Sequence, residues 1–298
     1  EQRQQRAEQP HRQIEGAGCQ QQRTAAERLQ NGAGLAALGF RQPRGACDVL
    51  RSLRDAQRIE RAARAGFAAV EIQFPYALPA IALREALERA GLPLVLINLP
   101  AGDLMSGGAG LACVPQQQTT FDQALQQALT YAAMVRPLNV NLLAGRLPAG
   151  LPAEQARQCL TANLRATAQA FATLGIGVLC EAINPLDMPG FVLNTPAQML
   201  DLLAAVDHPN LRLQLDFYHM ARQGFDLPAV IAQLAGTIGH VQFADCPGRG
   251  EPGTGQLDFP RALQALRASG YDGWLGAEYR PSGTDHLAWL EHWHHVHS

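Results

Sequence analysis

Residues 211–243 read LRLQLDFYHMARQGFDLPAVIAQLAGTIGHVQF. An apolar, strand-like run at 211–216 precedes a helix-like segment at 227–235, and a second strand-like run follows at 238–243. Strands that follow a helical crossover lie parallel to the strand before it, because the chain has returned to its starting edge. The stretch therefore predicts one β-α-β unit of a parallel α/β fold.

The same alternation extends in both directions from this unit. Further strands are expected at 69–74, 93–99, 138–143, 176–181 and 273–278, and further helices at 49–65, 79–90, 119–134, 152–174, 196–206, 258–269 and 284–296. A doubly wound open sheet and a barrel both alternate in this way. A G-x-G-x-x-G string occurs at 248–253, but it joins directly neither the strand before it nor the helix after it; no Walker loop occurs, and polar residues end the strands throughout. We therefore predict a (β/α)8 TIM barrel.

The beginning of the chain departs from this pattern. Residues 1–30 are rich in Gln and Arg and contain few large apolar side chains, so residues 1–47 are expected to form a polar, poorly ordered N-terminal segment. The barrel domain is expected over 48–298. Its first strand would have to come from about 35–40, so we predict a divergent or missing first strand. A missing strand would expose two sheet edges.

Composition restricts the classes of partner. The chain has 298 residues, a formal net charge of −2, 47% hydrophobic and 17% charged residues, which fits a soluble globular protein and argues against nucleic-acid binding. No apolar run approaches the length of a membrane span. The six cysteines form no C-x-x-C pair, so we expect reduced thiols and a cytoplasmic location. The expected partner is a small-molecule substrate. Homo-oligomerisation is left open.

Four consecutive strands end in oxygen-bearing side chains: Glu181, Asp216, Gln242 and Glu278. In a barrel the carboxyl ends of all strands meet at one face, so these side chains are expected to converge. Neighbouring carboxylates repel each other unless a cation lies among them, and oxygen donors suit Mg²⁺ or Mn²⁺. The absence of a His or Cys cluster argues against zinc. The alternative is a set of solvated strand ends.

Two further segments carry candidate substrate contacts. The loop at 244–255 combines glycines and prolines with Arg249 and Glu251, and a guanidinium suits a substrate carboxylate. His219 follows Asp216 by three residues, where a neutral imidazole would donate to a substrate oxygen. Glu71 lies on the strand at 69–74. An ordinary turn-rich loop and a structural histidine are the alternatives.

These residues lie within segments that resemble the hydroxypyruvate isomerase family of xylose isomerase-like TIM barrels. The similarity is closest to its 2-oxo-tetronate isomerase branch. The segments that carry it are 66–76, 99–103, 142–145, 181–190, 215–219, 239–255 and 276–281. The family's usual first strand, Phe-x-Ala-Asn-Leu-Ser, has no counterpart here.

The resemblance implies a role for each candidate. Glu181 and Glu278 match the paired catalytic glutamates, and with Asp216 and Gln242 they match the ligands of a divalent metal, Mg²⁺ or Mn²⁺. The expected substrate-binding residues are His219, Arg249, Glu71 and Glu251. The implied reaction is isomerisation of a small 2-keto-3-hydroxy acid by enediolate proton transfer: hydroxypyruvate to tartronate semialdehyde, or 2-dehydrotetronate to 3-dehydrotetronate.

Two alternatives stay open at this stage. A ketose 3-epimerase shares the fold, the metal and the carboxylates, and a catalytically impaired remnant would result from loss of the first strand. A DNA-repair endonuclease of the superfamily is disfavoured, because it would need a His-rich set of ligands for three metals and a basic face.

Overall fold

The computed structural model describes residues 45–48, 55–283 and 287–291, and for 45–48 and 55–56 it describes the backbone alone. The strands are β1 (Gly45–Asp48), β2 (Ala69–Ile72), β3 (Leu94–Asn98), β4 (Asn139–Asn141), β5 (Gly177–Glu181), β6 (Leu211–Asp216), β7 (Ile238–Phe243) and β8 (Leu275–Ala277). The helices are α2 (Asp55–Arg64), α3 (Ala80–Ala90), α4 (Gln118–Val135), α5 (Ala153–Ala172), α6 (Pro196–Val206), α7 (Phe217–Ala221), α8 (Leu227–Gln233) and α9 (Phe259–Ala268), with 3₁₀ turns at Pro75–Ala77, Leu104–Ser106 and Pro115–Gln117.

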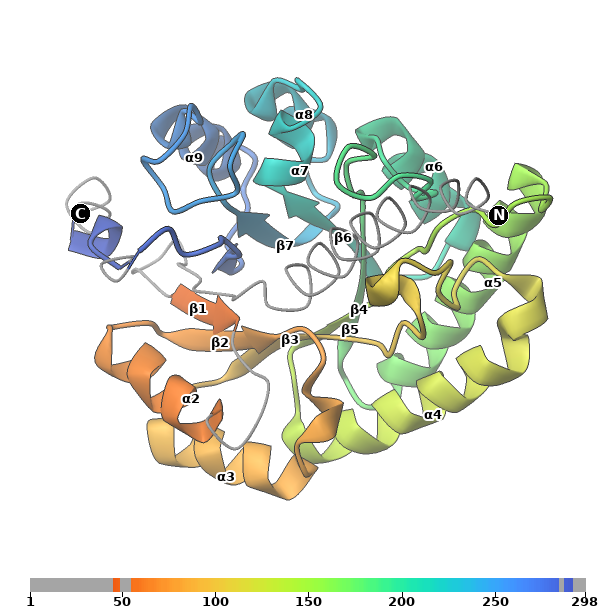
Figure 1. Cartoon of the computed structure of the whole chain (residues 1–298), viewed down its shortest axis with the longest axis horizontal. Coiled ribbons are helices and arrows are strands. Elements are labelled where there is room, and N and C mark those ends of the chain that lie inside the picture. The colour runs from red at the N-terminus through yellow and green to blue at the C-terminus, as the bar shows by residue number, and fades with distance from the viewer. Residues whose placement is uncertain (1–44, 49–54, 284–286, 292–298) are drawn as a thin grey trace, which may run out of the picture.

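The strands form a closed parallel barrel in sequence order, β1 to β8, with β1 paired to β8. The helices surround the strands in the order in which the chain visits them (Figure 1). The predicted (β/α)8 barrel is thereby confirmed. The strand and helix positions predicted between residues 69 and 278 agree with the observed bounds apart from their ends, while α7 was not predicted. Most of the helix expected at 284–296 lies outside the described residues.

The first strand is present but divergent in sequence, so of the two expected alternatives the missing strand is wrong. Residues Gly45–Asp48 pair in parallel with β2, Ala46 opposite Ala69, and with β8, Ala46 opposite Gly276. The barrel therefore has no open edge at this position, and it begins upstream of the boundary expected at residue 48. The sequence Gly-Ala-Cys-Asp lacks the β-branched residues that mark a strand, so neighbouring strands on both sides define it. The candidate stretch 35–40 lies outside the described residues.

The main apolar core lies between the strands and the helices around them. Helix side chains such as Leu83, Phe121, Leu164 and Phe171 are fully buried there, together with strand residues such as Val140. Burial of this kind is the main source of stability in an α/β barrel. Polar side chains lie instead at the carboxyl ends of the strands.

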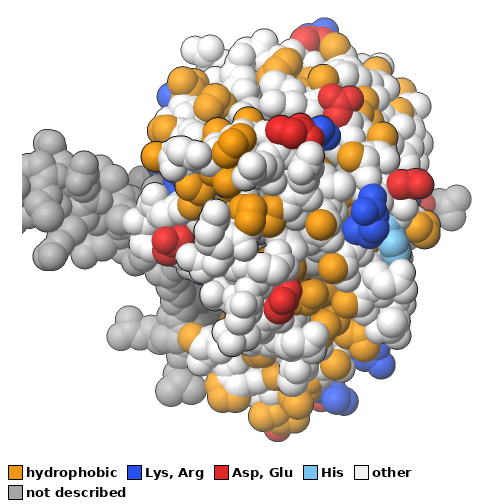
Figure 2. Space-filling view, turned by 90° about the vertical axis from the view of Figure 1, so that its right-hand side faces the viewer, with side chains coloured by type: hydrophobic (Ala, Val, Ile, Leu, Met, Phe, Trp, Pro, Cys, Tyr) orange, Lys and Arg blue, Asp and Glu red, His pale blue; other side chains and the backbone are white. Residues whose placement is uncertain are grey.

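The surface shows no concentration of one charge on the face in Figure 2. Acidic and basic side chains are scattered there singly among apolar and neutral ones (Figure 2). No helix in the described part of the chain combines the length and the apolar character needed to cross a membrane. Cys113, Cys159, Cys180 and Cys246 are free thiols, as expected for them.

Candidate active site

A cavity opens at the carboxyl ends of the strands. It is lined by Gln73, Phe74, Asn98, Met105, Leu143, Glu181, Ile183, Asp187, Met188, His219, Arg249, Glu278, Tyr279 and Arg280. Charged groups from the ends of β5 and β8 and from the loop after β7 thus share one cavity, which both polar and apolar side chains line. Of the predicted site residues, Glu181, His219, Arg249 and Glu278 line this cavity.

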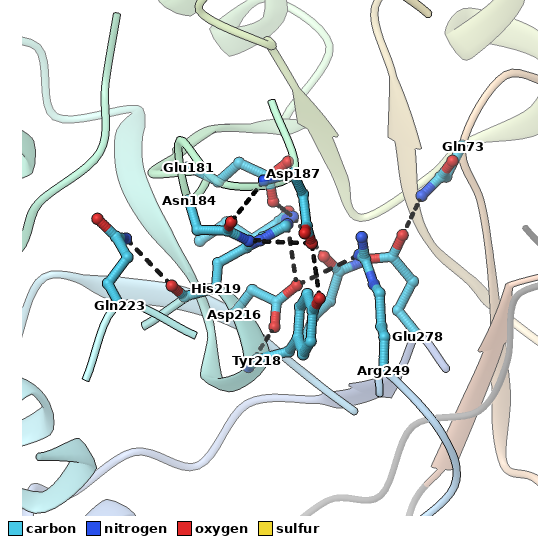
Figure 3. A network of polar contacts seen from close by, with 12 residues as sticks. Gln73, Glu181, Asn184, Asp187, Asp216, Tyr218, His219, Gln223, Arg249 and Glu278 are labelled. Carbon is cyan, nitrogen blue, oxygen red and sulfur yellow. Dashed lines mark hydrogen bonds and ion pairs between the residues drawn. The ribbon is translucent and has the colours of Figure 1, made fainter. Parts of the chain in front are cut away.

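The centre of the site is a carboxylate cluster bridged by one arginine (Figure 3). Nη2 of Arg249 lies 2.8 Å from Oε2 of Glu278 and 3.6 Å from Oδ2 of Asp216. The guanidinium also lies over the ring of Tyr218, 5.0 Å from its centroid. Gln73 donates a hydrogen bond to the other oxygen of Glu278. Residues from four different segments therefore hold Glu278 and Arg249 in place.

The environment raises the pKa of each carboxyl group in this cluster. Burial, followed by repulsion from Glu278 and Asp216, places the pKa of Glu181 well above its usual range. Burial raises the pKa of Asp216 to about 7, although Arg249 opposes the shift. Burial also raises the pKa of Glu278, again against the effect of Arg249. Such shifts are typical of groups that exchange protons with a substrate.

His219, on α7, is buried beside this cluster, and its tautomer follows from its hydrogen bonds. The Asn184 side-chain oxygen accepts from the backbone N–H of Asp187 at 2.8 Å, which fixes the orientation of that amide. Its Nδ2 therefore donates to Nδ1 of His219 at 2.7 Å. The proton of the neutral ring lies on Nε2, which is 3.5 Å from Oδ2 of Asp216. Burial and the charges of Arg249 and Arg280 hold the pKa of His219 well below its usual range, so the ring is neutral.

The loop after β7 presents Arg249 to the cavity. Its organising residue is Asp245, whose buried carboxylate accepts from the backbone N–H groups of Cys246, Gly253 and Leu257 at 2.8, 2.8 and 3.0 Å. Arg249 itself has a φ of 56°, a left-handed conformation that is uncommon for a residue with a side chain. The loop predicted as functional from its glycines and prolines is thus a fixed scaffold for one arginine.

A chain of buried hydrogen bonds runs from the catalytic face into the barrel. His240 donates to Glu71 at 2.7 Å, Gln242 donates to the other oxygen of Glu71 at 2.8 Å, and Gln214 donates to Gln242 at 2.6 Å and to Glu181. Since β2 and β7 are not neighbours in the sheet, these bonds cross the barrel interior. We call this set of five residues the interior network.

Two of the expected substrate-binding residues lie outside the cavity lining. Glu71 was predicted to contact substrate, but its carboxylate is buried, accepts from His240 and Gln242, and does not line the cavity. Glu251 was predicted likewise, but it is buried outside the cavity lining and accepts from the backbone N–H of Ser282 at 2.8 Å. Their contact with a substrate stays a prediction.

Several site residues were missed by the sequence analysis: Gln73, Asn184, Asp187, Gln214, Tyr218, His240 and Arg280. Three of these residues could have been predicted from the alternation of side chains along a strand, in which every second residue lies on the same face. Gln73, Gln214 and His240 each lie two positions from a predicted residue on the same strand or its extension, and alternate strand residues share a face. Asn184 and Asp187 lie in a loop, where no such period applies.

The four oxygen-bearing side chains at the strand ends have the chemistry that a divalent cation requires. Glu181, Asp216, Gln242 and Glu278 can each offer a side-chain oxygen to a cation, and Oδ2 of Asp216 is buried and accepts no hydrogen bond from any residue that the structure describes. These features fit Mg²⁺ or Mn²⁺. Among the residues that the structure describes, no three His, Cys, Asp or Glu side chains are already gathered as a metal centre. Arg249 supplies the positive charge between the carboxylates here.

The fold and the site agree with the comparison to protein families. The family model described as xylose isomerase-like TIM barrel matches residues 59–293. The chain belongs to this family. Hydroxypyruvate isomerase of Escherichia coli (strain K12) is 39% identical over 236 residues, which cover 78% of this chain and 92% of the relative. The 2-oxo-tetronate isomerase of Pectobacterium atrosepticum is 35% identical over 238 residues, 79% of this chain and 91% of the relative.

Solved structures extend this similarity. The crystal structure of an AP endonuclease of family 2 from Brucella melitensis has a TM-score of 0.76 and 34% identity, covering 80% of this chain and 93% of that one. The structure of 3-keto-D-glucoside 4-epimerase from Escherichia coli, with 22% identity and a TM-score of 0.69 over 82% and 97% of the two chains, shares the fold. With isomerases among its relatives at 33–40% identity, the chain is an isomerase.

Proposed function

We propose that this isomerase interconverts small 2-keto-3-hydroxy acids with their aldehyde or 3-keto isomers. The observation that carries the proposal is the pair of glutamates, buried Glu181 and partly buried Glu278, that line one cavity from the ends of β5 and β8. The curated relatives are named for two such reactions, the isomerisation of hydroxypyruvate and of 2-oxo-tetronate.

The two glutamates differ in their surroundings, and this difference suggests their roles. Glu278 is paired with Arg249 at 2.8 Å, which favours its ionised form and suits it to act as the base. Glu181 has no such ion pair within the described part of the chain, and burial with neighbouring carboxylates places its pKa well above its usual range. Glu181 is therefore suited to act as the general acid. Groups whose pKa values are pushed apart commonly divide these roles.

The proposed reaction of hydroxypyruvate uses these roles in turn. Glu278 removes a proton from C3, and the electron pair forms the C2–C3 double bond of an enediolate. Glu181 donates a proton to C2, while the C3 hydroxyl proton passes to the C2 oxygen through Nε2 of His219. The C3 oxygen then forms the aldehyde of tartronate semialdehyde. Exchange with solvent returns both glutamates to their starting states.

We also propose a divalent cation, Mg²⁺ or Mn²⁺, as cofactor. Its ligands would be Glu181, Asp216, Gln242 and Glu278, whose oxygens suit a hard ion. When bound, such an ion supplies Lewis-acid stabilisation of the negative charge that develops on the substrate oxygens. Oδ2 of Asp216, which is buried and accepts no hydrogen bond from the described residues, supports this proposal.

The alternatives are judged on the same observations. A ketose 3-epimerase returns a proton to the same carbon, and the paired glutamates would serve it equally, but the exposed Arg280 at the cavity favours an acid over a neutral sugar. The remnant hypothesis depended on the absence of a first strand. Since β1 pairs with both of its neighbours, that ground is removed.

The test is an assay of the full chain with Mn²⁺ or Mg²⁺ on hydroxypyruvate and on 2-dehydrotetronate in D₂O. Isomerisation with deuterium at the new C–H is expected, and Glu278→Gln should reduce kcat roughly 10³-fold or more, because the base is removed. Glu85→Gln, at an exposed site on α3, is the matched control and should be fully active. No turnover by the folded chain, or full activity of Glu278→Gln, would refute the proposal.

A further inference from the structure

We infer that Arg280, and not Arg249, binds the carboxylate of the substrate. This inference rests on the proposed function, since it names the group that would distinguish a keto acid from a sugar. The sequence analysis assigned the carboxylate to Arg249, and the structure gives that side chain a different set of partners.

Arg249 is already committed to the carboxylate cluster. Its side chain is 13% exposed, and Nη2 contacts both Glu278 and Asp216 while the guanidinium plane lies over Tyr218. Burial alone would lower its pKa, but these carboxylates outweigh it and raise the pKa of Arg249. A substrate carboxylate beside Arg249 would therefore approach Glu278 and Asp216, and like charges at this distance repel.

Arg280 is the other arginine of the cavity, and its surroundings differ. It lines the same cavity as Glu181 and Glu278, yet it is exposed. Over the described ranges, no carboxylate forms an ion pair with its guanidinium. Its positive charge contributes to the low pKa of His219, which indicates that the charge acts on the reaction site. A free guanidinium at a cavity mouth is a suitable site for a carboxylate, which it binds through two parallel hydrogen bonds.

The segment after β8 holds Arg280 at a fixed place relative to the base. The backbone N–H of Arg280 donates to the carbonyl of Arg249 at 2.7 Å, and the N–H of Ser282 donates to Glu251 at 2.8 Å. Glu278 and Arg280 are two residues apart, so their Cα atoms are separated by at most about 7 Å. This spacing suits an acid of three or four carbons, with its reacting carbon near Glu278 and its carboxylate at Arg280.

The experiment compares an acid with its uncharged counterpart. Hydroxypyruvate and dihydroxyacetone differ in that a CH₂OH group replaces the carboxylate, and isomerisation of the latter gives glyceraldehyde. Arg280→Ala should raise KM for hydroxypyruvate roughly 10- to 100-fold with little change in kcat, and should leave kcat/KM for dihydroxyacetone within about twofold. Arg280→Lys should recover part of the loss. Arg212→Ala, an exposed arginine on β6 outside the cavity lining, should match the wild type.

Binding of glycolate, measured by calorimetry, keeps this inference separate from the proposed function. Arg280→Ala should weaken glycolate binding roughly tenfold or more, whether or not the chain turns over a keto acid. If the wild type binds glycolate through Arg280 but isomerises neither acid, the proposed function fails and the carboxylate site stands. Unchanged affinity in Arg280→Ala, equal losses for both substrates, or no glycolate binding by the wild type would overturn the inference.

Discussion

Arg249 and Glu278 form a 2.8 Å ion pair at the centre of the cavity, although they come from the loop after β7 and the end of β8. The pair places a positive charge where the sequence predicts a metal cation. Arg249 is therefore a counter-ion of the carboxylate cluster, and its charge opposes the entry of a second cation.

Replacing Arg249 by Gln should increase the affinity for Mn²⁺. Removing one positive charge beside Glu278 and Asp216 should tighten Mn²⁺ binding roughly tenfold or more, since unit charges a few Å apart interact by several kcal/mol in a protein. Titration calorimetry of the metal-free proteins would measure this. Arg280→Gln is the matched control, and its affinity should stay near that of the wild type. Weaker binding by Arg249→Gln would show that Arg249 does not oppose the ion.

Asp216 should make the metal-free protein less stable as the pH rises. Burial raises its pKa to about 7 from a usual value of 3.8, so the folded state disfavours the ionised form. This group costs nothing below about pH 4; its cost grows between about pH 4 and pH 7 and is constant above about pH 7. Asp216→Asn should therefore be more stable than the wild type at pH 8 by on the order of 4 kcal/mol, and about equal to it near pH 4.

Urea unfolding of the metal-free proteins at several pH values would measure this difference. Saturating Mn²⁺ should reverse the order at pH 8, because it stabilises the wild type and not the variant that has lost a ligand. A stability difference that is independent of pH would mean that Asp216 is ionised without cost in the folded protein.

The sequence predicts the elements of the barrel and the residues at its mouth for a physical reason. Glu181 and Asp216 end apolar runs, and parallel strands bring all such ends to one face, so local pattern and topology together locate them. The same reasoning does not predict β1. Gly45–Asp48 has no strand-like pattern of its own and is a strand because it pairs with β2 and β8.

Residue roles depended on contacts that no sequence pattern contains. Arg249 lies in a loop, and its orientation toward Glu278 depends on three backbone hydrogen bonds to Asp245. Glu71 has the same place in the strand pattern as the catalytic groups, but its partner is His240, far away in the sequence. Which carboxylate meets a cation, an amide or solvent is therefore decided by tertiary structure.

Replacing Asn184 by Asp should change the tautomer of His219. In the wild type the Asn184 amide donates to Nδ1, which leaves the proton on Nε2 facing the cavity. A carboxylate there would instead accept from an Nδ1–H group and favour the imidazolium. The proton transfer assigned to the neutral ring should slow roughly tenfold or more, and the histidine should titrate within the working pH range.

Nitrogen NMR of labelled protein reports the tautomer, and the pH profile of kcat reports the titration. His219→Gln, which keeps a donor but does not titrate, should slow the reaction without adding an ionisation to the profile. A wild-type spectrum with the proton on Nδ1 would contradict the assignment.

Loss of His240 alone should destabilise the folded protein more than replacement of both His240 and Glu71 by neutral hydrogen-bonding residues. His240 and Glu71 are 2.7 Å apart and almost inaccessible to solvent, at 0% and 1% side-chain exposure. His240→Ala leaves a buried carboxylate with Gln242 as its remaining partner, which should lower the free energy of unfolding by about 3–5 kcal/mol. The double variant Glu71→Gln/His240→Gln removes the charge and keeps hydrogen-bonding groups, so its loss should be smaller than that of His240→Ala.

The double variant also tests whether the interior network positions the metal ligands. Glu71 accepts from Nε2 of Gln242, and this bond turns the amide oxygen of Gln242 toward Gln214 and the carboxylate cluster. If that orientation matters, the double variant should fold normally yet bind Mn²⁺ roughly tenfold more weakly, because one oxygen ligand is no longer fixed. Urea unfolding and Mn²⁺ calorimetry on the same samples separate the two effects. Unchanged Mn²⁺ affinity in a folded double variant would restrict the interior network to a structural role.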